Sequence, residues 1–470
     1  MNLKFANNSC ILLTLGALAG CVSEDISPDS NGGSGVNGAV DYLANSRYNI
    51  IFIFADDWGW GDLACHGHDV ILTPNIDKLA SEGIDFKAFN VGSPVSSASR
   101  TAVMTGNFPS RHGMHQHLAG ANKNAAKQMP NYLDNTVTLL PKLLQSAGYK
   151  TAHYGKWHLG NISSAPEPMT YGYDDTRVYN GNGPNLDTGP TGYVTSEYTA
   201  QSVDATIAFI TEHKYEPFFV NLWIHETHQD IEPLDEEREV YADIADPEQS
   251  YYSVVTAADK HIGRLMQALK DEGLDDNTLV IFSSDNGPET ATSNSLKLSV
   301  GDTGGLKGRK RSLFEGGVKV PFIVRLPGVV PAGVVDDSTL LATVDLLPTF
   351  CSIAGVSLPE DYLPDGENIS LALLGEDFTR EKAMLHFWPG DDDESLNLWP
   401  RLGAKDNKYK VLINYDMSRV ELYDYKNDWG EENNLAEGFV DSLSEHKYTS
   451  KIMELTDLAY EYFYSLDYVL

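Results

Sequence analysis

The stretch Asn49-Ile50-Ile51-Phe52-Ile53-Phe54 is an uninterrupted apolar run that leads into the acidic pair Asp56-Asp57. A continuous run of this kind is typical of a strand buried on both faces of a parallel sheet. In an open sheet of parallel strands, ligands bind at the carboxyl ends of the strands. The run therefore predicts a fold class, and it also points to the edge of the sheet where chemistry is expected.

Helical segments and buried strands alternate along the chain after this run. Thr73-Pro74 opens a helix, with Thr73 as its N-cap and Pro74 at its first position. Further helices are expected at 136–147, 197–213, 251–272 and 344–354, and further strands at 150–154, 218–223, 278–283 and 320–326. This alternation predicts an α/β fold with a large mixed, mainly parallel sheet sandwiched by helices.

The pattern changes after about Gly375. Short strand-like stretches near 383–388, 408–413 and 421–425 are followed by a helical segment at about 443–462. We therefore expect a main domain over residues 47–375 and a smaller C-terminal α+β subdomain over 376–470. That subdomain would hold a small antiparallel sheet and a terminal helix.

The first residues predict export. Lys4 precedes the apolar run 11–19, which is too short to span a membrane permanently. The run ends in Leu18-Ala19-Gly20-Cys21, which resembles a bacterial lipobox. We expect a signal peptide over residues 1–20, a lipidated Cys21 and a flexible tether over 22–46; an ordinary secretory signal is the alternative. The chain is thus expected in the periplasm or on the outer membrane, with membrane contact through the lipid anchor alone.

The composition limits the possible partners. The chain has 34 Lys and Arg against 67 Asp and Glu, a net charge of −33. A field this negative excludes general binding to nucleic acid or to anionic membranes. An anionic substrate must therefore be held by a local cationic pocket. Of four cysteines, only Cys65 and Cys351 fall in the folded part, which permits one disulfide at most.

The stretch Ser96-Ser97-Ala98-Ser99-Arg100 opens a short helical run that ends at Gly106. Ser96 or Ser97 can act as its N-cap, and Gly106 fits the C-cap. Hydroxyl groups at the positive end of a helix dipole, beside a guanidinium, attract an oxyanion. Taken alone, the stretch fits equally well a plain capped helix with a surface arginine.

Two predicted strand ends carry oxygen ligands. Asp56-Asp57 follows the first strand, and Asp285-Asn286 follows the strand at 278–283. Adjacent carboxylates repel each other unless a cation or a proton lies between them. An all-oxygen set suits Ca²⁺ or Mg²⁺. The alternative is that Asp57 and Asp285 cap the turns that follow them.

Cationic and imidazole groups follow other strands. Lys156 and His158 are two residues apart, so both are expected on one side of an extended segment. In His225-Glu226-Thr227-His228 we interpret His228 as a proton donor, with His225 as the fallback. The Gly-rich basic loop 306–310 predicts an anion clamp. The alternatives are a surface position for Lys156, ordinary packing for His158, zinc binding for His225 and His228, and a solvated surface for the loop.

These short sequence motifs, in the order in which they occur along the chain, resemble the motifs of a type I sulfatase of the alkaline phosphatase superfamily. The stretch beginning at Ser96, with Thr105-Gly106 after it, resembles the family signature whose first residue is oxidised to formylglycine (3-oxoalanine). The other matching blocks are Asp56-Asp57, Gly155-Lys156-Trp157-His158, Thr227-His228, Asp285-Asn286-Gly287, 306–317, 344–349 and Leu422-Tyr423-Asp424. The resemblance extends from Asn49 to Glu437 and assigns residues 47–375 to the sulfatase catalytic domain.

Three departures from the family pattern bear on the assignment. Ser96 stands where many relatives have Cys, which implies a bacterial Ser-type enzyme matured by a radical-SAM sulfatase-maturating enzyme before export. Ala98 replaces the commoner Pro. Gln229 follows His228 where Pro is frequent, which weakens the role of His228.

The resemblance implies a sulfuric ester hydrolase and a role for each site residue. Hydrated formylglycine would attack sulfur, His228 would protonate the leaving alcohol, and His158 would take a proton from the second hydroxyl. The implied catalytic residues are Ser96, Arg100, Lys156, His158, His228 and Lys310. The implied ligands of Ca²⁺, with Mg²⁺ as the alternative, are Asp56, Asp57, Ser96, Asp285 and Asn286.

The expected substrate is a sulfated oligosaccharide. Export and strong acidity favour a marine polysaccharide degrader, and carrageenan-type algal galactans are the first expectation. Aromatic rings stack on sugars and arginine binds sulfate, so we expect His115, His225, Trp388 and Arg401 to form a sugar subsite. Two other functions stay open: a phosphoesterase or phosphonate hydrolase of the same superfamily, and a non-catalytic sulfated-glycan-binding protein.

Overall fold

The computed structural model describes residues 47–160, 163–179, 195–228, 231–289, 300–390 and 400–470. The expected signal peptide, Cys21 and the tether at 22–46 lie outside the described residues. Among the residues that are described, no helix is both long enough and apolar enough to cross a membrane.

The main sheet has eight described strands and is mixed but mainly parallel, as the sequence predicts. In spatial order they are β5 (Asp175–Tyr179), β4 (Lys150–Lys156), β6 (Phe218–Trp223), β1 (Asn49–Ala55), β7 (Thr278–Ser284), β8 (Phe322–Arg325), β2 (Ile84–Phe86) and β9 (Val334–Asp336). β1 lies inside the sheet and pairs in parallel with β6 and β7. β8 runs antiparallel to both of its neighbours, β7 and β2.

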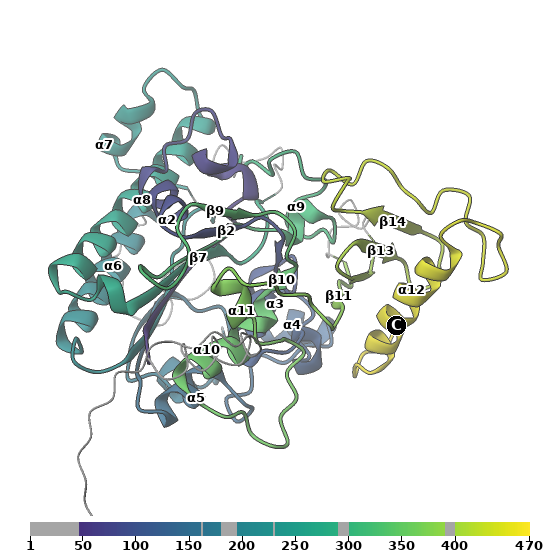
Figure 1. Cartoon of the computed structure of the whole chain (residues 1–470), viewed down its shortest axis with the longest axis horizontal. Helices are drawn as coiled ribbons and strands as arrows, with labels where there is room; N and C mark the ends of the chain where they lie inside the picture. Colours follow the sequence, from purple (N-terminus) through teal and green to yellow (C-terminus); the bar gives the residue numbers. More distant parts are fainter. Residues whose placement is uncertain (1–46, 161–162, 180–194, 229–230, 290–299, 391–399) are drawn as a thin grey trace, which may run out of the picture. The chain divides into compact units, whose positions relative to one another are not determined.

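Helices cover both faces of this sheet because β1 is apolar from Ile50 to Ala55. Ile50, Phe52 and Phe54 face a core shared with α3 (Ser96–Thr105), α5 (Leu140–Ser146) and α10 (Leu346–Ala354). The alternate residues Ile51 and Ile53 face a second core. That second core is shared with α2 (Pro74–Ser81), α6 (Thr195–Glu212) and α8 (Glu248–Asp271), and Figure 1 shows the two groups of helices on opposite sides of the sheet.

A small antiparallel sheet with a terminal helix follows, also as predicted. Its strands are β11 (Met384–Phe387), β12 (Leu402–Lys405), β13 (Tyr409–Ile413) and β14 (Val420–Asp424). The apolar face of α12 (Thr449–Tyr464), including Ile452 and Leu455, packs on Ala404 and Val411 of this sheet. The helix begins later than expected, and the side chain of Leu443 is 89% exposed.

Several local expectations need correction. α5 begins at Leu140 rather than at 136, because Pro141 is accommodated only in the first turn of a helix. The N-cap of α3 is Val95, so Ser96 is the first helical residue, and neither Ser96 nor Ser97 is a cap. Cys65 and Cys351 are both free thiols, so they form no disulfide.

Short elements complete the described fold. The short strands are β3 (Phe89–Asn90) and β10 (Leu341–Ala342), which pair in parallel. The short α-helices are α4 (Ala121–Ala126), α7 (Asp235–Arg238), α9 (Glu315–Val318) and α11 (Ser370–Leu373). The 3₁₀ turns are η1 (Trp60–Asp62), η2 (Ala64–His66), η3 (Pro109–His112), η4 (Pro168–Tyr171), η5 (Glu239–Tyr241), η6 (Asp275–Asn277) and η7 (Thr343–Asp345).

Candidate active site

The carboxyl ends of β1 and β7 bring the predicted oxygen ligands together. Ala55 is paired with Ser284, so the residues that follow each strand emerge side by side. The Asp57 backbone amide donates to Asp285 Oδ1 (3.1 Å), and Asn286 Nδ2 donates to Asp57 Oδ1 (2.8 Å). Asp57 has φ = 63°, in the left-handed region that is uncommon for a residue other than glycine. The chain thus turns sharply at the point where its carboxylate joins the group.

Three buried carboxylates meet at this point. One oxygen from each of Asp56, Asp57 and Asp285 lies within 4.8 Å of the others, and none of the three side chains is exposed. Burial, and after it the carboxylate of Asp56, raise the pKa of Asp285. Like charges this close need a cation between or beside them. The donor set, completed by the Asn286 amide oxygen, fits a hard divalent cation.

Ser96 lies beside the carboxylates at the first position of α3. Its Oγ donates to Asp56 Oδ1 (3.0 Å) and lies 3.4 Å from Asn286 Oδ1 and from Lys156 Nζ. Only 2% of Ser96 is exposed. The position is at the positive end of the α3 dipole, which favours negative charge. The hydroxyl therefore faces both the oxygen ligands and a cation.

Three cations frame the cluster, one for each carboxylate. Lys156 Nζ lies 2.5 Å from Asp56 Oδ2, and Lys310 Nζ lies 2.5 Å from Asp57 Oδ2. Arg100, one turn after Ser96 on α3, donates through Nε (3.1 Å) and Nη2 (2.7 Å) to Asp285 Oδ2. Burial would raise the pKa of Asp57, but Lys310 and His228 lower it to about 2.

Arg100 is further held by an aromatic wall. Its guanidinium lies 4.9 Å from the ring centroid of Trp223 and 5.5 Å from that of Phe54. Nη1 has no hydrogen-bond partner among the described residues, although it is buried. An unpaired donor of this kind is available to an anionic group that enters the site.

Two histidines of the turn after β6 reach the cluster. The turn is fastened to β1, because the Asp56 amide donates to the Glu226 carbonyl (3.1 Å). His228 Nε2 lies 3.9 Å from Asp57 Oδ2 and is slightly exposed, whereas His225 Nδ1 lies 3.9 Å from Asp56 Oδ2 and is fully buried. Burial, then the neighbouring His228, hold the pKa of His225 well below its usual value.

His158 also reaches this region, but not as the sequence predicts. β4 ends at Lys156, and His158 has φ = 54°, so the two side chains do not share one extended segment. His158 Nε2 lies 3.1 Å from the Leu118 carbonyl, to which it can only donate. Burial, then Lys156, lower the pKa of His158 well below its usual value. The ring is therefore neutral, with Nδ1 as its proton acceptor.

The match to a family model agrees with this geometry. A model described as "Sulfatase" matches residues 48–356, and one described as "N-sulphoglucosamine sulphohydrolase, C-terminal" matches residues 308–457. The first match spans the α/β sheet and every strand end described above. The chain belongs to the sulfatase family.

Relatives and solved structures of this sulfatase family agree with the assignment. The chain is 32% identical to mouse N-acetylgalactosamine-6-sulfatase over 362 residues, which are 69% of this chain and 66% of the mouse protein. It is 28% identical to a sulfatase of Formosa agariphila, covering 83% of this chain and 85% of that protein. The crystal structure of Ps i-CgsB in complex with k-i-k-neocarrahexaose superposes with a TM-score of 0.72 at 25% identity, covering 88% of this chain and 92% of that chain.

One residue of this sulfatase site was missed by the sequence analysis. Glu289 follows Asn286-Gly287-Pro288 after β7, and its carboxylate lies 3.2 Å from Lys310 Nζ and also pairs with Arg311. Lys310 is thus held between Asp57 and Glu289. The available signal was its distance of three residues from Asn286 in a predicted ligand loop.

The four residues assigned to a sugar subsite do not form one group. His225 belongs to the charged cluster. His115 is 1% exposed and packs against the rings of Phe387 (5.3 Å between centroids) and Tyr468 (4.9 Å). Trp388 is fully buried, and its backbone amide donates to the carbonyl of the half-buried Arg401. Their role in substrate binding stays a prediction.

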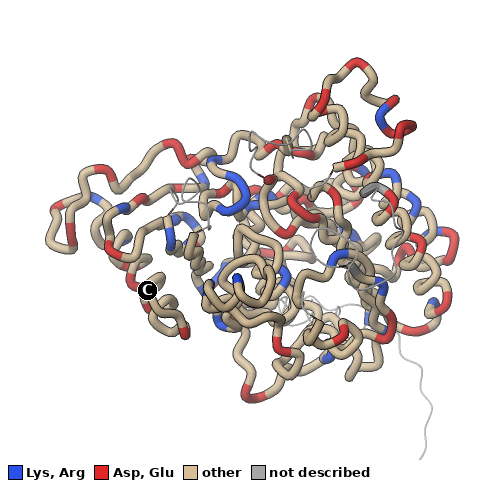
Figure 2. The backbone as a smooth tube through the Cα atoms, turned by 180° about the vertical axis from the view of Figure 1, so that it is seen from behind, with Lys and Arg blue, Asp and Glu red and all other residues tan. Residues whose placement is uncertain are grey.

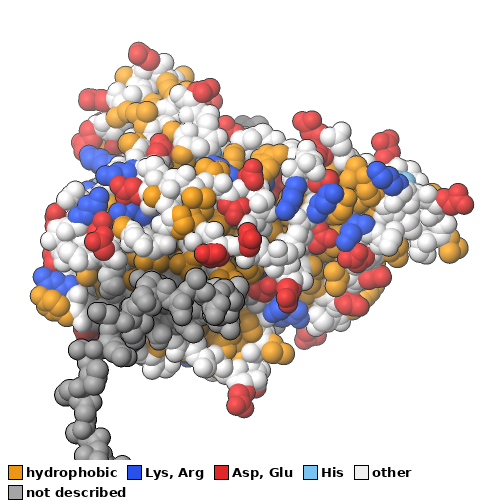
Figure 3. Space-filling view, viewed as in Figure 1, with side chains coloured by type: hydrophobic (Ala, Val, Ile, Leu, Met, Phe, Trp, Pro, Cys, Tyr) orange, Lys and Arg blue, Asp and Glu red, His pale blue; other side chains and the backbone are white. Residues whose placement is uncertain are grey.

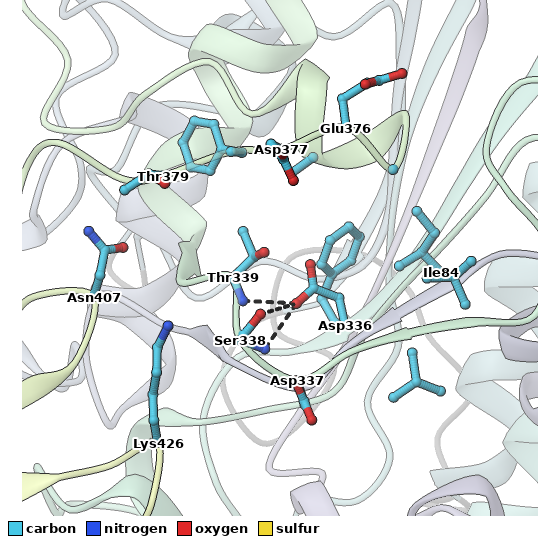
Figure 4. A pocket seen from close by; sticks show the side chains of 16 residues that line it. Ile84, Asp336, Asp337, Ser338, Thr339, Glu376, Asp377, Thr379, Asn407 and Lys426 are labelled. Atoms are coloured by element: carbon cyan, nitrogen blue, oxygen red, sulfur yellow. Dashed lines mark hydrogen bonds between the residues drawn. The ribbon is translucent and has the colours of Figure 1, made fainter.

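A separate cavity of about 570 Å³ lies at the β2–β9 edge of the sheet (Figure 4). None of its lining residues belongs to the carboxylate cluster. It presents four acidic side chains and one lysine: Asp336, Asp337, Glu376, Asp377 and Lys426. The Asp336 carboxylate is used locally, because it accepts hydrogen bonds from Ser338 and Thr339. Its excess negative charge makes the cavity unsuitable for a sulfate ester.

Proposed function

We propose that this chain hydrolyses sulfate esters of a sulfated carbohydrate, with a formylglycine nucleophile made from Ser96. The observation that supports this most directly is the position of the Ser96 hydroxyl. It lies at the start of α3, within 3.0–3.4 Å of Asp56, Asn286 and Lys156. A nucleophile placed there lies between a cation site and the groups that neutralise sulfate oxygens.

A divalent cation fits the carboxylate cluster, and the residues that would hold it are Asp56, Asp57, Asp285 and Asn286. When bound, the cation supplies Lewis-acid polarisation of sulfate oxygens and lowers the pKa of a coordinated hydroxyl. Ca²⁺ is the first candidate and Mg²⁺ the second, because every donor in the group is oxygen. Arg100 fixes the carboxylate of Asp285 through two N–H bonds and keeps that ligand in place.

The surrounding residues provide charge and proton transfer. Lys156 and Lys310 neutralise the sulfate oxygens as charge develops on the breaking S–O bond. His228, at the more exposed edge of the cluster, donates a proton to the leaving sugar oxygen. His158 is neutral with Nδ1 as acceptor, so it suits the removal of a proton from the hydrated nucleophile. The leaving alcohol gains the proton that His228 loses.

Sulfated galactans of the carrageenan type are the proposed substrate class. Ps i-CgsB, which is similar to this chain over most of both lengths, was crystallised with a neocarrahexaose. The excess of acidic over basic residues runs along much of the described chain, in its loops as well as its helices (Figure 2). The lipid anchor at Cys21 and the maturase stay predictions from the sequence.

A phosphoesterase or phosphonate hydrolase is the second candidate. Nitrogen ligands favour transition metals, whereas the grouped ligand atoms here are carboxylate oxygens and the two nearby histidines lie 3.9 Å from them. A non-catalytic glycan-binding protein would not need a neutral His158 with Nδ1 as a proton acceptor. Both alternatives are therefore less favoured by the geometry.

The proposal is tested by asking whether Ser96 is oxidised in the active protein and whether activity requires it. The chain is produced with and without a radical-SAM maturase, and the peptide containing Ser96 is analysed by mass spectrometry alongside sulfate release. We expect loss of two hydrogens from Ser96 in the active sample only, and no turnover in S96A. S81A is the control, because Ser81 is exposed at the end of α2 and lies outside the signature stretch; its conversion at Ser96 and its turnover should match those of the parent chain. Full activity with an intact Ser96 would overturn the proposal.

A further inference from the structure

We propose that Cys65, His66 and Asp85 bind a transition-metal ion, with zinc as the best match, at a site distinct from the carboxylate cluster. One ligand atom of each residue lies within 4.8 Å of the others. Cys65 and His66 belong to η2, and Asp85 is the middle residue of β2. The site would therefore join two segments about twenty residues apart in the chain.

The His66 ring is oriented as a metal ligand is. Its Nδ1 lies 2.7 Å from the Trp60 carbonyl, to which it can only donate. A neutral ring then presents the lone pair of Nε2 to Asp85, whose oxygens lie 3.1 and 3.2 Å away. Two acceptors facing each other repel unless a proton or a metal ion lies between them. A backbone carbonyl on the other ring nitrogen is a common support for a metal-bound histidine.

The distance between His66 Nε2 and the Asp85 oxygens also suits two ligands of one zinc ion. Zinc bonds of about 2.0–2.1 Å to nitrogen and oxygen place two ligand atoms of a tetrahedron roughly 3.3 Å apart. The 3.1–3.2 Å between His66 Nε2 and the Asp85 oxygens is close to that edge length. Lys87 Nζ lies 2.6 Å from Asp85 Oδ2, so Oδ1 is the oxygen available to the metal.

The donor types differ from those of the carboxylate cluster. A thiolate, an imidazole and one carboxylate select a transition metal, whereas an all-oxygen group selects calcium or magnesium. The His66 and Asp85 side chains are almost fully buried, while Cys65 is partly exposed, so an ion can enter and a water can complete its coordination. Burial, then Asp85 and Asp77, raise the pKa of the Cys65 thiol, and a bound cation would reverse that effect.

The metal site would stabilise the segment that follows Asp57. The chain runs from Asp57 through Trp60 to η2, where the Cys65 amide donates to Asp77 Oδ1 on α2 (3.0 Å). The Trp60 ring packs against the His66 ring, with 4.2 Å between centroids and a tilt of 31°. A metal at Cys65 and His66 would fix this segment to β2. The competing explanation is a protonated His66 that bridges Trp60 and Asp85 without any metal.

Cobalt binding distinguishes a metal site from a protonated His66 that holds no metal. The full chain is stripped with a chelator, supplied with excess Ca²⁺ to fill the carboxylate cluster, and titrated with Co²⁺. We expect a thiolate-to-cobalt charge-transfer band at one ion per chain, displaced by Zn²⁺. Co²⁺ on oxygen ligands gives no such band, so the carboxylate cluster does not contribute.

Variants assign the band to these residues. C65A is expected to abolish it and H66Q to weaken cobalt binding, while C351A, at the buried thiol in α10, keeps it unchanged. Replacing Cys65 removes a partly exposed side chain, so loss of the fold is not expected, and the far-UV circular dichroism of C65A should match that of the parent chain. The absence of the band in the parent chain, or its persistence in C65A, would overturn the proposal.

Discussion

Each carboxylate of the site has a buried cation of its own. Asp56 faces Lys156, Asp57 faces Lys310 and Asp285 faces Arg100. Removing one partner of a buried pair leaves an unpaired charge, which costs about 3–5 kcal/mol. Substitutions of these lysines would therefore mix a loss of stability with a loss of chemistry. His225 and His228 are better probes at the residue scale, because each lies 3.9 Å from its carboxylate oxygen, farther than the lysines do.

The position of His228 leads to a prediction that depends on the leaving group. H228A should reduce turnover of a sulfated sugar by about 10²–10⁴, the usual contribution of a general acid. Turnover of a nitrophenyl sulfate should fall much less, because its leaving phenolate needs no proton. Steady-state kinetics on both substrates give the comparison.

His225 supplies the matched variant for this experiment. It is the earlier histidine of the same turn and is fully buried beside Asp56. H225A should reduce the turnover of both substrates by similar factors, because the His225 side chain acts by packing rather than by proton transfer. If H225A rather than H228A shows the leaving-group dependence, the proton donor is His225 and the assignment of His228 is wrong.

The charged residues of the site could be predicted where they directly follow an apolar strand. Asp56, Asp57, Asp285 and Asn286 are read from the chain because the strand before each pair is unmistakable. Glu289 and the backbone reversal at His158 could not be predicted in this way. Their positions depend on which loops meet in space, and no local pattern encodes that.

At the scale of elements, the start of α2 shows how a cap can come from elsewhere in the chain. Thr73 occupies the N-cap position as predicted, but its hydroxyl donates to Asp77 instead of capping the helix. The N-terminal amides are met by Asp259 of α8, whose carboxylate accepts from the amides of Asn75 (3.1 Å) and Ile76 (2.8 Å). A carboxylate at the positive end of a helix is favourable, but this one is largely buried.

This cap predicts a pH dependence of stability. Burial raises the pKa of Asp259 from 3.8 to about 6. Between these pH values the folded chain binds the proton of Asp259 more tightly than the unfolded chain does. The contribution of Asp259 to the free energy of unfolding therefore falls as pH rises from about 4 to about 6. By linkage, the shift corresponds to about 3 kcal/mol. D259N cannot titrate, so the difference in free energy of unfolding, parent minus D259N, should be larger at pH 4 than at pH 7.

Urea unfolding of both proteins across this pH range measures the difference. D204N is a suitable control, because Asp204 pairs with Arg264 at an exposed position on α6. Its free-energy difference from the parent should vary little with pH. A difference for D259N that stays constant, or that grows as pH rises, would contradict the assignment.

The strands predicted well are those buried on both faces. β1, β6 and β7 agree with their apolar runs to within one residue, because a strand buried on both faces is built mostly from apolar side chains. β2 (IDF), β9 (VVD) and β12 (LGAK) were not predicted, since each is short and contains a charged residue. The reversed direction of β8 depends on how the chain returns to the sheet, which its own residues do not specify.

At the scale of the whole molecule, a chain with an excess of acidic residues holds a group of buried lysines. Acidic and basic side chains are interspersed on the face shown in Figure 3. Inside, Lys405 and Lys410 of the small sheet reach Glu315 of α9 at 2.9 and 2.8 Å, and Lys410 also reaches Glu431 at 2.9 Å. Lys319 lies 3.6 Å from Glu315. Through Glu315, the small C-terminal sheet is linked to the main domain.

This link leads on to the carboxylate cluster. The Gly317 carbonyl accepts the amide of Gly287, the residue after Asn286, at 3.0 Å. A Cβ on Gly287 would lie 1.8 Å from the Gly316 carbonyl oxygen, so the contact admits only glycine. The α9 turn therefore supports the loop after β7 that carries Asp285 and Asn286, and the small sheet supports the α9 turn.

E315Q tests whether the small sheet supports the loop after β7 through α9. The substitution leaves three buried lysines facing one glutamate, so the free energy of unfolding should fall by about 3–5 kcal/mol. Calcium affinity, measured by titration calorimetry below the unfolding transition, should fall as well, because the Asn286–Gly287 backbone loses its fixed neighbour. E437Q, at an exposed position, should change neither quantity. A lower stability with unchanged calcium affinity would mean that the small sheet stabilises the fold without positioning the site. Unchanged stability would show that the buried charges contribute no net free energy.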